Sequence, residues 1–249
     1  MTRAVDYDLV APAYDKRYER NRYDGVLAVF RRFVGESARV DAAEVGCGTG
    51  HWLAELHGSV RTAAGLDRSA EMLQRARTAA PYAHIVRGRA EQLPWAEGRF
   101  DRLFCINALH HFDDPDAFMR EAHRVLRPAG ALMIVGLDPH PRLDSWWIYD
   151  YFPAAREADL VRYMATALIR EKLLAAGFVD SMTEIAQHIP AAAVPFAIAV
   201  DRGLVDRHAT SQLTVLSDAE YEDGLQRLRA EQPILRADLR LYATFARAA

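Results

Sequence analysis

A glycine-rich segment, Gly46-Cys-Gly-Thr-Gly50, is the part of the sequence best suited to hold a ligand. It follows a short apolar run that ends at Val45 and precedes a stretch with a helical pattern. Glycines at such a turn let the backbone approach a ligand closely. The spacing departs from the dinucleotide fingerprint G-x-G-x-x-G, because the last glycine comes earlier. Glu44 puts a carboxylate beside the loop, which would repel a pyrophosphate and suit a positively charged ligand.

Two adjacent histidines, His110 and His111, close the segment Asn107-Ala-Leu-His-His111, which follows the apolar run 100–106. Histidine titrates near neutral pH, so either ring could take a proton from an acceptor molecule. The alternative is that both rings are structural. Neighbouring side chains point in different directions, and we therefore expect only His111 to face the acceptor. His110 would then pack toward the helix that starts at Asp114.

Aromatic residues gather in two places, the segment Trp146–Phe152 and the N-terminal stretch Tyr7–Tyr18, which also contains Tyr14. The first follows an apolar run that ends at Leu137, and its rings could form walls for an apolar or aromatic small molecule. Alternatively, they pack helices onto the sheet. Hydrophobic packing alone could explain the N-terminal tyrosines. The predicted acceptor contacts are Tyr14, Trp146, Trp147 and Tyr149.

The elements that must position these residues alternate between short apolar runs and amphipathic stretches. This alternation predicts a parallel sheet with helices on both faces, which binds ligands beyond the carboxyl ends of its strands. The expected strands are 40–45, 60–67, 84–87, 100–106, 131–137, 178–188 and 239–247. The expected helices include 7–18, 23–34, 50–56 and 159–176, one capped by Ser69 and one that starts at Asp114-Pro115. Pro128-Ala-Gly130 predicts a turn.

These motifs resemble, in their order along the chain, the class I S-adenosylmethionine-dependent methyltransferases, especially the methyltransferase type 11 group. The resemblance rests on Glu44-Val-Gly-Cys-Gly-Thr-Gly50, on Asp67 after the second strand, and on Gly88-Arg-Ala-Glu-Gln-Leu-Pro94. It continues through Asn107-Ala-Leu-His-His111 and Arg124-Val-Leu-Arg-Pro-Ala-Gly130. It covers about residues 40–138 well and the flanks only in outline.

The resemblance implies a doubly wound, seven-stranded, mostly parallel sheet of the Rossmann-like methyltransferase fold, with helical lid segments. It implies S-adenosyl-L-methionine as cofactor and methyl transfer to an oxygen, nitrogen or carbon of a small acceptor. The domain organisation expected is an N-terminal helical lid (1–36), a cofactor-binding α/β core (37–189), a helical insertion (190–238) and a last core strand (239–249). The implied cofactor-binding residues are Glu44, Gly46, Cys47, Gly48, Gly50, Asp67, Arg68, Met72, Ala90, Glu91, Asn107 and Ala108.

One residue departs from the family pattern. Arg89 stands where similar enzymes have an aspartate that meets the exocyclic amine of adenine. Ala90 could still offer its backbone amide, and Glu91 could replace the missing acid. Arg89 could instead stack on the adenine or face solvent. Met72 would either pack on the adenine or belong to the core, whereas the resemblance places Asp67 on the ribose hydroxyls.

Composition limits the other function classes. Among the 249 residues, 31 Lys and Arg against 34 Asp and Glu give a net charge of −3, so nothing suggests a nucleic-acid partner. Two cysteines exclude a disulfide framework or a four-cysteine zinc site, and we predict no metal. Without a signal-peptide pattern or a membrane-spanning apolar run, we expect a cytoplasmic enzyme with a small-molecule acceptor and no membrane partner. Monomer and homodimer remain open.

Two other functions are considered. A nicotinamide-dependent oxidoreductase would share the fold, but the glycine spacing and the position of Glu44 argue against it. A catalytically silent module that binds S-adenosylmethionine or another protein is compatible with the same residues. Incubation with labelled S-adenosylmethionine and a panel of acceptors would separate the three.

Overall fold

A central sheet of eight strands organises the computed structural model, which describes residues 11, 14–15, 18, 23–35 and 39–249. The strand order is β3-β2-β1-β4-β5-β8-β6, and β7 also pairs with β8. We predicted seven strands, and the additional one is the two-residue β6. The strands are β1 (Asp41–Val45), β2 (Thr62–Asp67), β3 (His84–Arg87), β4 (Phe100–Ile106), β5 (Leu126–Leu137), β6 (Ser145–Trp146), β7 (Phe178–Pro195) and β8 (Ile234–Ala248).

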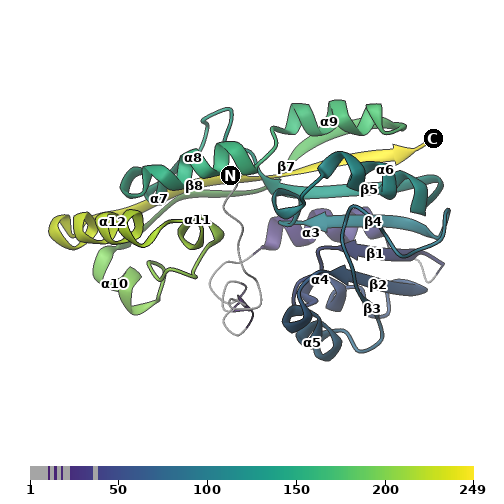
Figure 1. The fold of residues 1–249 in the computed structure, drawn as a ribbon, viewed down its shortest axis with the longest axis horizontal. Helices are drawn as coiled ribbons and strands as arrows, with labels where there is room; N and C mark the ends of the chain where they lie inside the picture. The colour runs from purple at the N-terminus through teal and green to yellow at the C-terminus, as the bar shows by residue number, and fades with distance from the viewer. Residues whose placement is uncertain (1–10, 12–13, 16–17, 19–22, 36–38) are drawn as a thin grey trace.

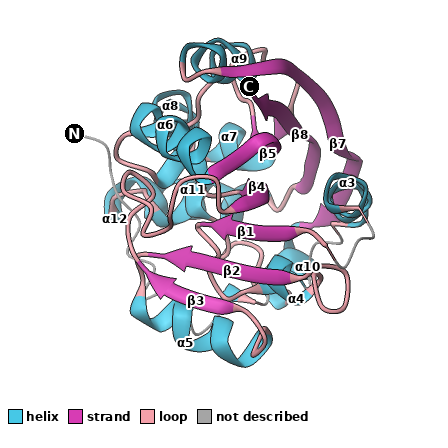
Figure 2. Cartoon of the chain, turned by 90° about the vertical axis from the view of Figure 1, so that its right-hand side faces the viewer, coloured by secondary structure: helices cyan, strands magenta, loops and turns pink. Residues whose placement is uncertain are grey.

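Helices cover both faces of this sheet, as the doubly wound prediction requires (Figure 2). The pairs among β1 to β5 are parallel, and every pair with β8 is antiparallel. The helices are α3 (Asp24–Val34), α4 (His51–Ala54), α5 (Ala70–Ala79), η1 (Leu109–His111), α6 (Pro115–Val125), α7 (Trp147–Tyr151), α8 (Pro153–Arg162), α9 (Thr166–Ala175), α10 (Phe196–Asp201), α11 (Ser211–Thr214) and α12 (Asp218–Glu231). None of these described helices is long and apolar enough to cross a bilayer.

The central strands are apolar on both faces because each face has its own core. In β4, Leu103 and Cys105 join the cluster beneath α6 and α9, whereas Phe104 and Ile106 join the cluster beneath α3, α4 and α5. Successive strand side chains point to opposite faces, so a strand buried on both sides needs a continuous apolar run. This pattern explains why the sequence located these strands well.

Local capping signals set the starts of two helices on the ligand-facing side of the sheet. The Ser69 hydroxyl accepts a hydrogen bond from Met72 N at 3.1 Å and thereby caps α5. The Asp114 carboxylate accepts one from Ala117 N at 2.9 Å, with Pro115 in the first turn of α6. Both predicted helix starts are confirmed.

A second group of helices lies beyond the sheet, at the left of Figure 1, where the long β7–β8 ribbon extends to meet it. We call α7, α8, α10, α11 and α12 the cap. The cap has its own apolar cluster, in which Trp147, Phe152, Leu213 and Leu228 are buried. The β7–β8 ribbon therefore connects two separately packed bodies.

The β7–β8 ribbon is longer than the sequence predicted. Residues 192–195 of β7 pair with 237–234 of β8, so 190–195 and 234–238 are strand although we assigned them to a helical insertion. The segment carries Pro190 and Pro195, which disfavour a central strand and are tolerated at an edge. Since β7 pairs only with β8, the prolines interrupt no second ladder.

Three smaller predictions are also corrected. The helix expected over 159–176 is two helices, because α8 ends at Arg162 and the Asp138 carboxylate accepts hydrogen bonds from Thr166 N and Oγ1 at 2.8 and 2.9 Å where α9 begins. The helix expected over 50–56 is the single turn α4. The turn expected at 128–130 interrupts the pairing of β5 with β4, and Ala129 there has φ +63°. The predicted helix 7–18 lies mostly outside the described residues.

Candidate functional site

The glycine-rich loop lies at the carboxyl end of β1, and its backbone requires glycine. Gly46, Gly48 and Gly50 have φ values of +76°, +49° and +81°, a region that other residues rarely adopt. A Cβ on Gly50 would lie 2.9 Å from Ala76 Cα, and one on Gly46 would collide with Ala108. The loop thus forms a cradle lined by backbone rather than by side chains.

Asp67 ends β2 beside this loop and holds its shape. One carboxylate oxygen accepts a hydrogen bond from Gly48 N at 2.8 Å, and the other accepts one from Ser69 N at 2.9 Å. Burial raises the pKa of Asp67, and these amide donors partly oppose that shift. A carboxylate in this position has further lone pairs for the hydroxyl groups of a ligand.

A first cavity lies over the loop, between the carboxyl ends of β1, β2 and β4, with a volume of about 70 Å³. The structure brings together nine of the twelve predicted cofactor-binding residues around it. Glu44, Cys47 and Gly50 do not line it. The lining residues are Tyr14, Gly46, Gly48, Leu66, Asp67, Arg68, Met72, Gly88, Arg89, Ala90, Glu91, Asn107, Ala108, His111, Phe112 and Asp113.

One predicted contact, Glu44, lies in β1 beneath the loop instead. Glu44 is 1% exposed, and its Oε2 has no hydrogen-bond partner among the described residues. Burial and the negative charge of Asp67 raise the pKa of Glu44 well above its usual value. A positively charged ligand above the loop would supply the counter-charge that this pair of acids lacks, so the site fits such a ligand.

Cys47, the other predicted contact in this part of the loop, has a buried side chain. Burial raises the pKa of its thiol well above the usual value, and the charge of Glu44 adds to the shift. The thiol therefore stays protonated and unreactive. Within the part of the chain that the structure describes, no group of three or more His, Cys, Asp or Glu residues is placed to hold a metal ion.

Arg89 is engaged by acids on the far wall of the first cavity. Its Nη2 lies 2.7 Å from Asp113 Oδ2, and its Nε lies 3.3 Å from Glu91 Oε2. Glu91 Oε1 also accepts a hydrogen bond from Asp113 N at 2.8 Å. We did not predict Asp113, because its sequence neighbour Asp114 carries the obvious capping signal. Asp113 therefore places a carboxylate on the wall where the family pattern has an aspartate and this chain has Arg89.

A second cavity, of about 830 Å³, lies between the sheet and the cap. Both cavities are lined by Asn107 and His111, so molecules bound in the two would meet at these residues. Asn107 has φ +54°, a left-handed conformation that asparagine tolerates better than most residues. The second cavity is lined by Tyr23, Asn107, His110, His111, Leu137, Trp146, Trp147, Ile148, Tyr163, Gln187, His188, Ile189, Pro190, Ala192, Val194, Arg202, Leu204, Ala209, Thr210, Ser211, Gln212, Leu235, Ala237, Leu239 and Leu241.

The two histidines both face the second cavity, so the expectation that only one would do so is wrong. Their ring centroids are 3.8 Å apart because η1 is a single tight turn. His111 also lines the first cavity, although we expected it to face only the acceptor. His110 instead stacks on Tyr163, with ring centroids 4.0 Å apart, and its Nε2 lies 3.1 Å from the Tyr163 hydroxyl.

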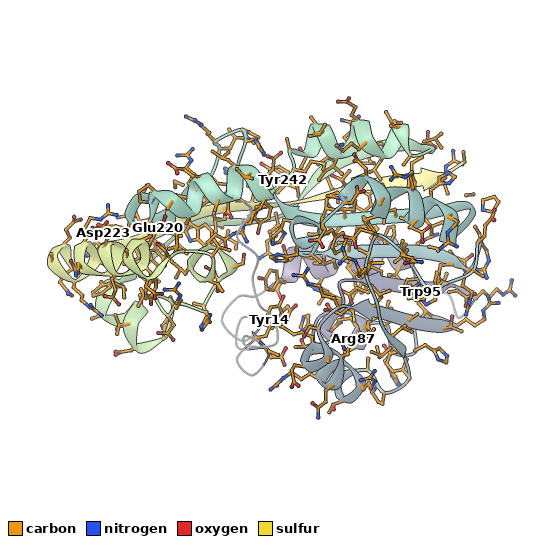
Figure 3. All side chains as sticks on the ribbon, in the orientation of Figure 1. Tyr14, Arg87, Trp95, Glu220, Asp223 and Tyr242 are labelled. Carbon is orange, nitrogen blue, oxygen red and sulfur yellow. The ribbon has the colours of Figure 1, made fainter. Side chains whose placement is uncertain are left out.

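The four aromatic residues predicted to contact the acceptor separate into three groups. Trp146 and Trp147 line the second cavity. Tyr14 lines the first cavity and packs with Val215 of the cap, so it lies between the core and the cap (Figure 3). Tyr149 lines neither, since its hydroxyl donates to Asp159 at 2.7 Å in the interior of the cap.

Comparisons with known proteins agree with this geometry. Residues 43–134 match the family model described as a methyltransferase domain. An uncharacterised methyltransferase of Synechocystis, sll0829, is 39% identical over 93 residues, which are 36% of this chain and 44% of that protein. The chain spans 40–44% of the length of three curated relatives that it matches.

Solved structures share the fold over much more of the chain. The YcgJ protein of Bacillus subtilis superposes with a TM-score of 0.64 and 20% identity over 89% of this chain and 97% of that one. Phosphoethanolamine N-methyltransferase 2 of Haemonchus contortus, solved with S-adenosyl-L-methionine, superposes with a TM-score of 0.63 and 17% identity over 96% of this chain and 57% of that one. The family match shows that residues 43–134 carry a class I S-adenosylmethionine-dependent methyltransferase domain, and the solved structures show that the chain shares the fold of such enzymes.

Proposed function

We propose that this protein binds S-adenosyl-L-methionine in the first cavity and methylates a small, apolar or aromatic acceptor held in the second. The observation that carries the proposal is the junction of the two cavities at Asn107 and His111. S-adenosyl-L-methionine supplies a methyl carbon already activated by a positively charged sulfur. The chain then has mainly to align donor and acceptor at this junction.

The residues around the first cavity have distinct tasks in this proposal. Asp67 accepts hydrogen bonds from the two ribose hydroxyls while Gly48 N fixes its orientation. The glycine loop accommodates the polar end of the cofactor, whose positive charge favours the ionised form of the buried Glu44 beneath it. Arg89 and Asp113 border the adenine end, and Met72 packs against the ring.

The test is a calorimetric titration of the wild type and of Asp67→Ala with S-adenosyl-L-methionine. Loss of two hydrogen bonds to a charged acceptor should cost about 3 kcal/mol, or roughly a hundredfold in affinity. Asp150→Ala, an exposed site on the cap, is the matched control and should bind normally. Unchanged affinity in a folded Asp67→Ala protein would contradict the assignment of Asp67 to the ribose. NADH should show no saturable binding, which separates this proposal from a nicotinamide-dependent enzyme.

A methylation assay with labelled cofactor then distinguishes an enzyme from a silent module. We infer that His111 shapes the junction of the cavities and is not a general base, because alignment suffices for an activated methyl donor. His111→Ala should raise the acceptor KM by about tenfold and leave the pH profile unchanged. A fall in kcat of about a hundredfold, with loss of the acid limb of the profile, would instead make His111 the base.

A further inference from the structure

The walls of the second cavity carry positive or neutral polar groups and no negative ones among the described residues. Of the lining side chains, Arg202 is the cation, and His110, His111 and His188 are the titratable groups. Gln212, Ser211, Thr210 and Tyr163 add hydroxyl and amide groups. The described wall contains neither Asp nor Glu, although Asp and Glu together number 34 in the whole chain.

A carboxylate behind the cavity wall, which contacts the lining residue Gln212, is already paired with a cation. Asp159 is 0% exposed and accepts hydrogen bonds from Tyr149 Oη at 2.7 Å and from Gln212 Nε2 at 2.9 Å. It also forms an ion pair with Arg162. The same Gln212 nitrogen lies 3.2 Å from the Tyr163 hydroxyl, so the amide presents its NH₂ group to both partners. The Asp159 carboxylate therefore pairs with groups inside the cap and is not available to a positively charged ligand.

Two other carboxylates, those of Asp238 and Asp138, are also engaged by groups of the protein itself. Asp238 lies 2.8 Å from His188 Nε2 and 3.2 Å from Arg240 Nη1. Asp138, which is buried, accepts hydrogen bonds from the start of α9. Neither side chain lines the cavity. A protonated amine in this cavity would therefore lose its hydration without gaining a carboxylate, which is costly.

Arg202 has the opposite character. It follows the last residue of α10, it is exposed, and it borders the second cavity. Its guanidinium makes no hydrogen bond or ion pair with the rest of the described chain. An unpaired arginine at the edge of an apolar cavity attracts an anion and can hold a carboxylate through two parallel hydrogen bonds.

The remainder of the second cavity is apolar. Trp146 and Trp147 come from the start of the cap, and Val194, Leu235 and Leu239 come from the β7–β8 ribbon. These side chains suit an apolar body. Three polar groups lie together beside them, since the Tyr163 hydroxyl is 3.1 Å from His110 Nε2 and 3.2 Å from Gln212 Nε2, and we call this the polar end. The cavity thus combines a long apolar wall, a polar end without acids, and a cation at its edge.

On the basis of the proposed function, we propose that the acceptor is an apolar molecule that is methylated on oxygen, either a hydroxyl or a carboxylate, and is not an amine. The acceptor oxygen forms a bond to the methyl carbon as the carbon–sulfur bond breaks, and the electron pair of that bond stays on sulfur. A carboxylate acceptor releases no proton. The proton of a hydroxyl acceptor passes to water.

The test compares three probes with one apolar body: para-pentylphenol, para-pentylbenzoate and para-pentylbenzylamine. Their binding is measured by calorimetry on protein saturated with S-adenosylhomocysteine, whose own binding is measured first. The phenol and the benzoate should bind at least about tenfold more tightly than the amine, because only the amine brings an uncompensated positive charge. Only these two should be methylated when the cofactor is S-adenosyl-L-methionine.

Two variants with matched controls assign the preference to this wall. Arg202→Gln should weaken the benzoate by about tenfold and leave the phenol unchanged, whereas Arg170→Gln, exposed on α9 outside the cavity, should change neither. Thr210 caps α11 and lines the cavity, and aspartate is also a good cap. Thr210→Asp should therefore fold normally and strengthen amine binding by about tenfold, and the neutral Thr210→Asn should not.

The outcomes separate this inference from the proposed function. If S-adenosylhomocysteine does not bind, the proposed function fails and the inference fails with it. If it binds and the amine matches or exceeds the other two probes, only the inference is overturned. The inference alone is also overturned if S-adenosylhomocysteine binds and none of the three probes does.

Discussion

Strand β1 carries two buried carboxyl groups whose surroundings are opposite. Asp41 at its amino end and Glu44 near its carboxyl end are both 1% exposed. Asp41 is paired with Arg61, and it accepts hydrogen bonds from Arg99 and Arg127 at 2.7 and 2.8 Å. The Arg61 guanidinium, with the other two, holds the pKa of Asp41 well below its usual 3.8, although burial alone would raise it.

Glu44 has no such partner. Its Oε2 makes no hydrogen bond within the described chain, and burial together with Asp67 raises its pKa. The two carboxyl groups are equally shielded from water, yet their pKa values shift in opposite directions. Asp41 lies among three partly exposed arginines near the surface, whereas Glu44 lies in the interior, where no cation of the described residues is beside it. At the amino ends of the strands the charges neutralise each other and stabilise the fold. At the carboxyl ends an acid remains uncompensated, which destabilises the empty protein and prepares it for a positively charged ligand.

The largest effect should come from Asp41→Asn. Removing one partner leaves three guanidinium groups without their shared carboxylate, which should lower the free energy of unfolding by about 3 kcal/mol. We take the lower end of the usual range because the three arginines are 33–53% exposed and water screens them. Chemical denaturation measures the loss. Affinity for S-adenosylhomocysteine should be unchanged, because Asp41 lies at the amino ends of the strands and the glycine loop lies at their carboxyl ends.

The control for Asp41→Asn is Asp180→Asn. Asp180 pairs with Arg247, but the two side chains are 66% and 49% exposed, so this pair should contribute less than about 1 kcal/mol. The pH dependence gives a second check. Since the folded pKa of Asp41 is lowered, its stabilisation is complete above pH 3.8 and is lost as the pH falls toward the lowered value. Equal losses in the two variants would remove the contrast between buried and exposed pairs.

Glu44→Gln should have the opposite sign. The amide removes a buried acid, so the empty protein should gain about 1 kcal/mol of stability at neutral pH. Because the folded pKa is raised, the contribution of Glu44 to stability falls as the pH rises above 4.5, and the variant should lack this decline. Its affinity for S-adenosyl-L-methionine should fall roughly tenfold, about 1.4 kcal/mol.

A comparison of two ligands tests whether Glu44 acts through its charge. S-adenosylhomocysteine lacks the positive charge on sulfur, so its affinity for Glu44→Gln should fall less than that of S-adenosyl-L-methionine. Glu71→Gln, an exposed site on α5, should leave both affinities and the stability unchanged. An equal loss for the two ligands would show that Glu44 acts through the shape of the loop and not through its charge.

The first cavity could be predicted from the sequence because short-range signals build it. The glycine spacing, Asp67 at the end of a strand, and the caps at Ser69 and Asp114 each lie within a few residues of what they position. Such signals depend on backbone geometry, which the local sequence determines. The same reasoning missed Asp113, whose role depends on Arg89 across the cavity.

The second cavity could not be predicted in this way, because its walls come from residues that lie between Tyr23 and Leu241. Trp146 and Trp147 were found by their composition, but Tyr149 in the same segment turns to Asp159. The residues 190–195 are rich in alanine and proline, so local preference argues against a strand, and pairing with β8 overrides it. Asp41 carries no local signal either, since its three arginines come from three other parts of the chain.

The smallest effect should come from the exposed pair of Arg89 and Asp113, which sharpens the contrast with Asp41. Both pairs join arginine to aspartate at 2.7 Å, yet Arg89 and Asp113 are 62% and 59% exposed. Their coupling energy, from Arg89→Gln, Asp113→Asn and the double variant, should be zero within experimental error. The corresponding cycle for Asp41 and Arg99 should give at least about 1 kcal/mol. If the two cycles gave equal coupling energies, burial would not explain the difference between the ion pairs at the two ends of the strands.

The same Arg89→Gln variant decides what the guanidinium does for the cofactor. Asp113 and Glu91 already engage Arg89, so we expect it to border the adenine without stacking on it. Affinity for S-adenosylhomocysteine should then change by less than about twofold. Loss of a guanidinium that stacked on the adenine would instead lower the affinity by about fivefold. Calorimetry measures the affinity of Arg89→Gln and of the control Arg87→Gln, which changes a neighbouring exposed arginine on β3. A fivefold or greater loss in Arg89→Gln alone would assign the arginine to adenine binding, and this departure from the family pattern would then be part of the cofactor site.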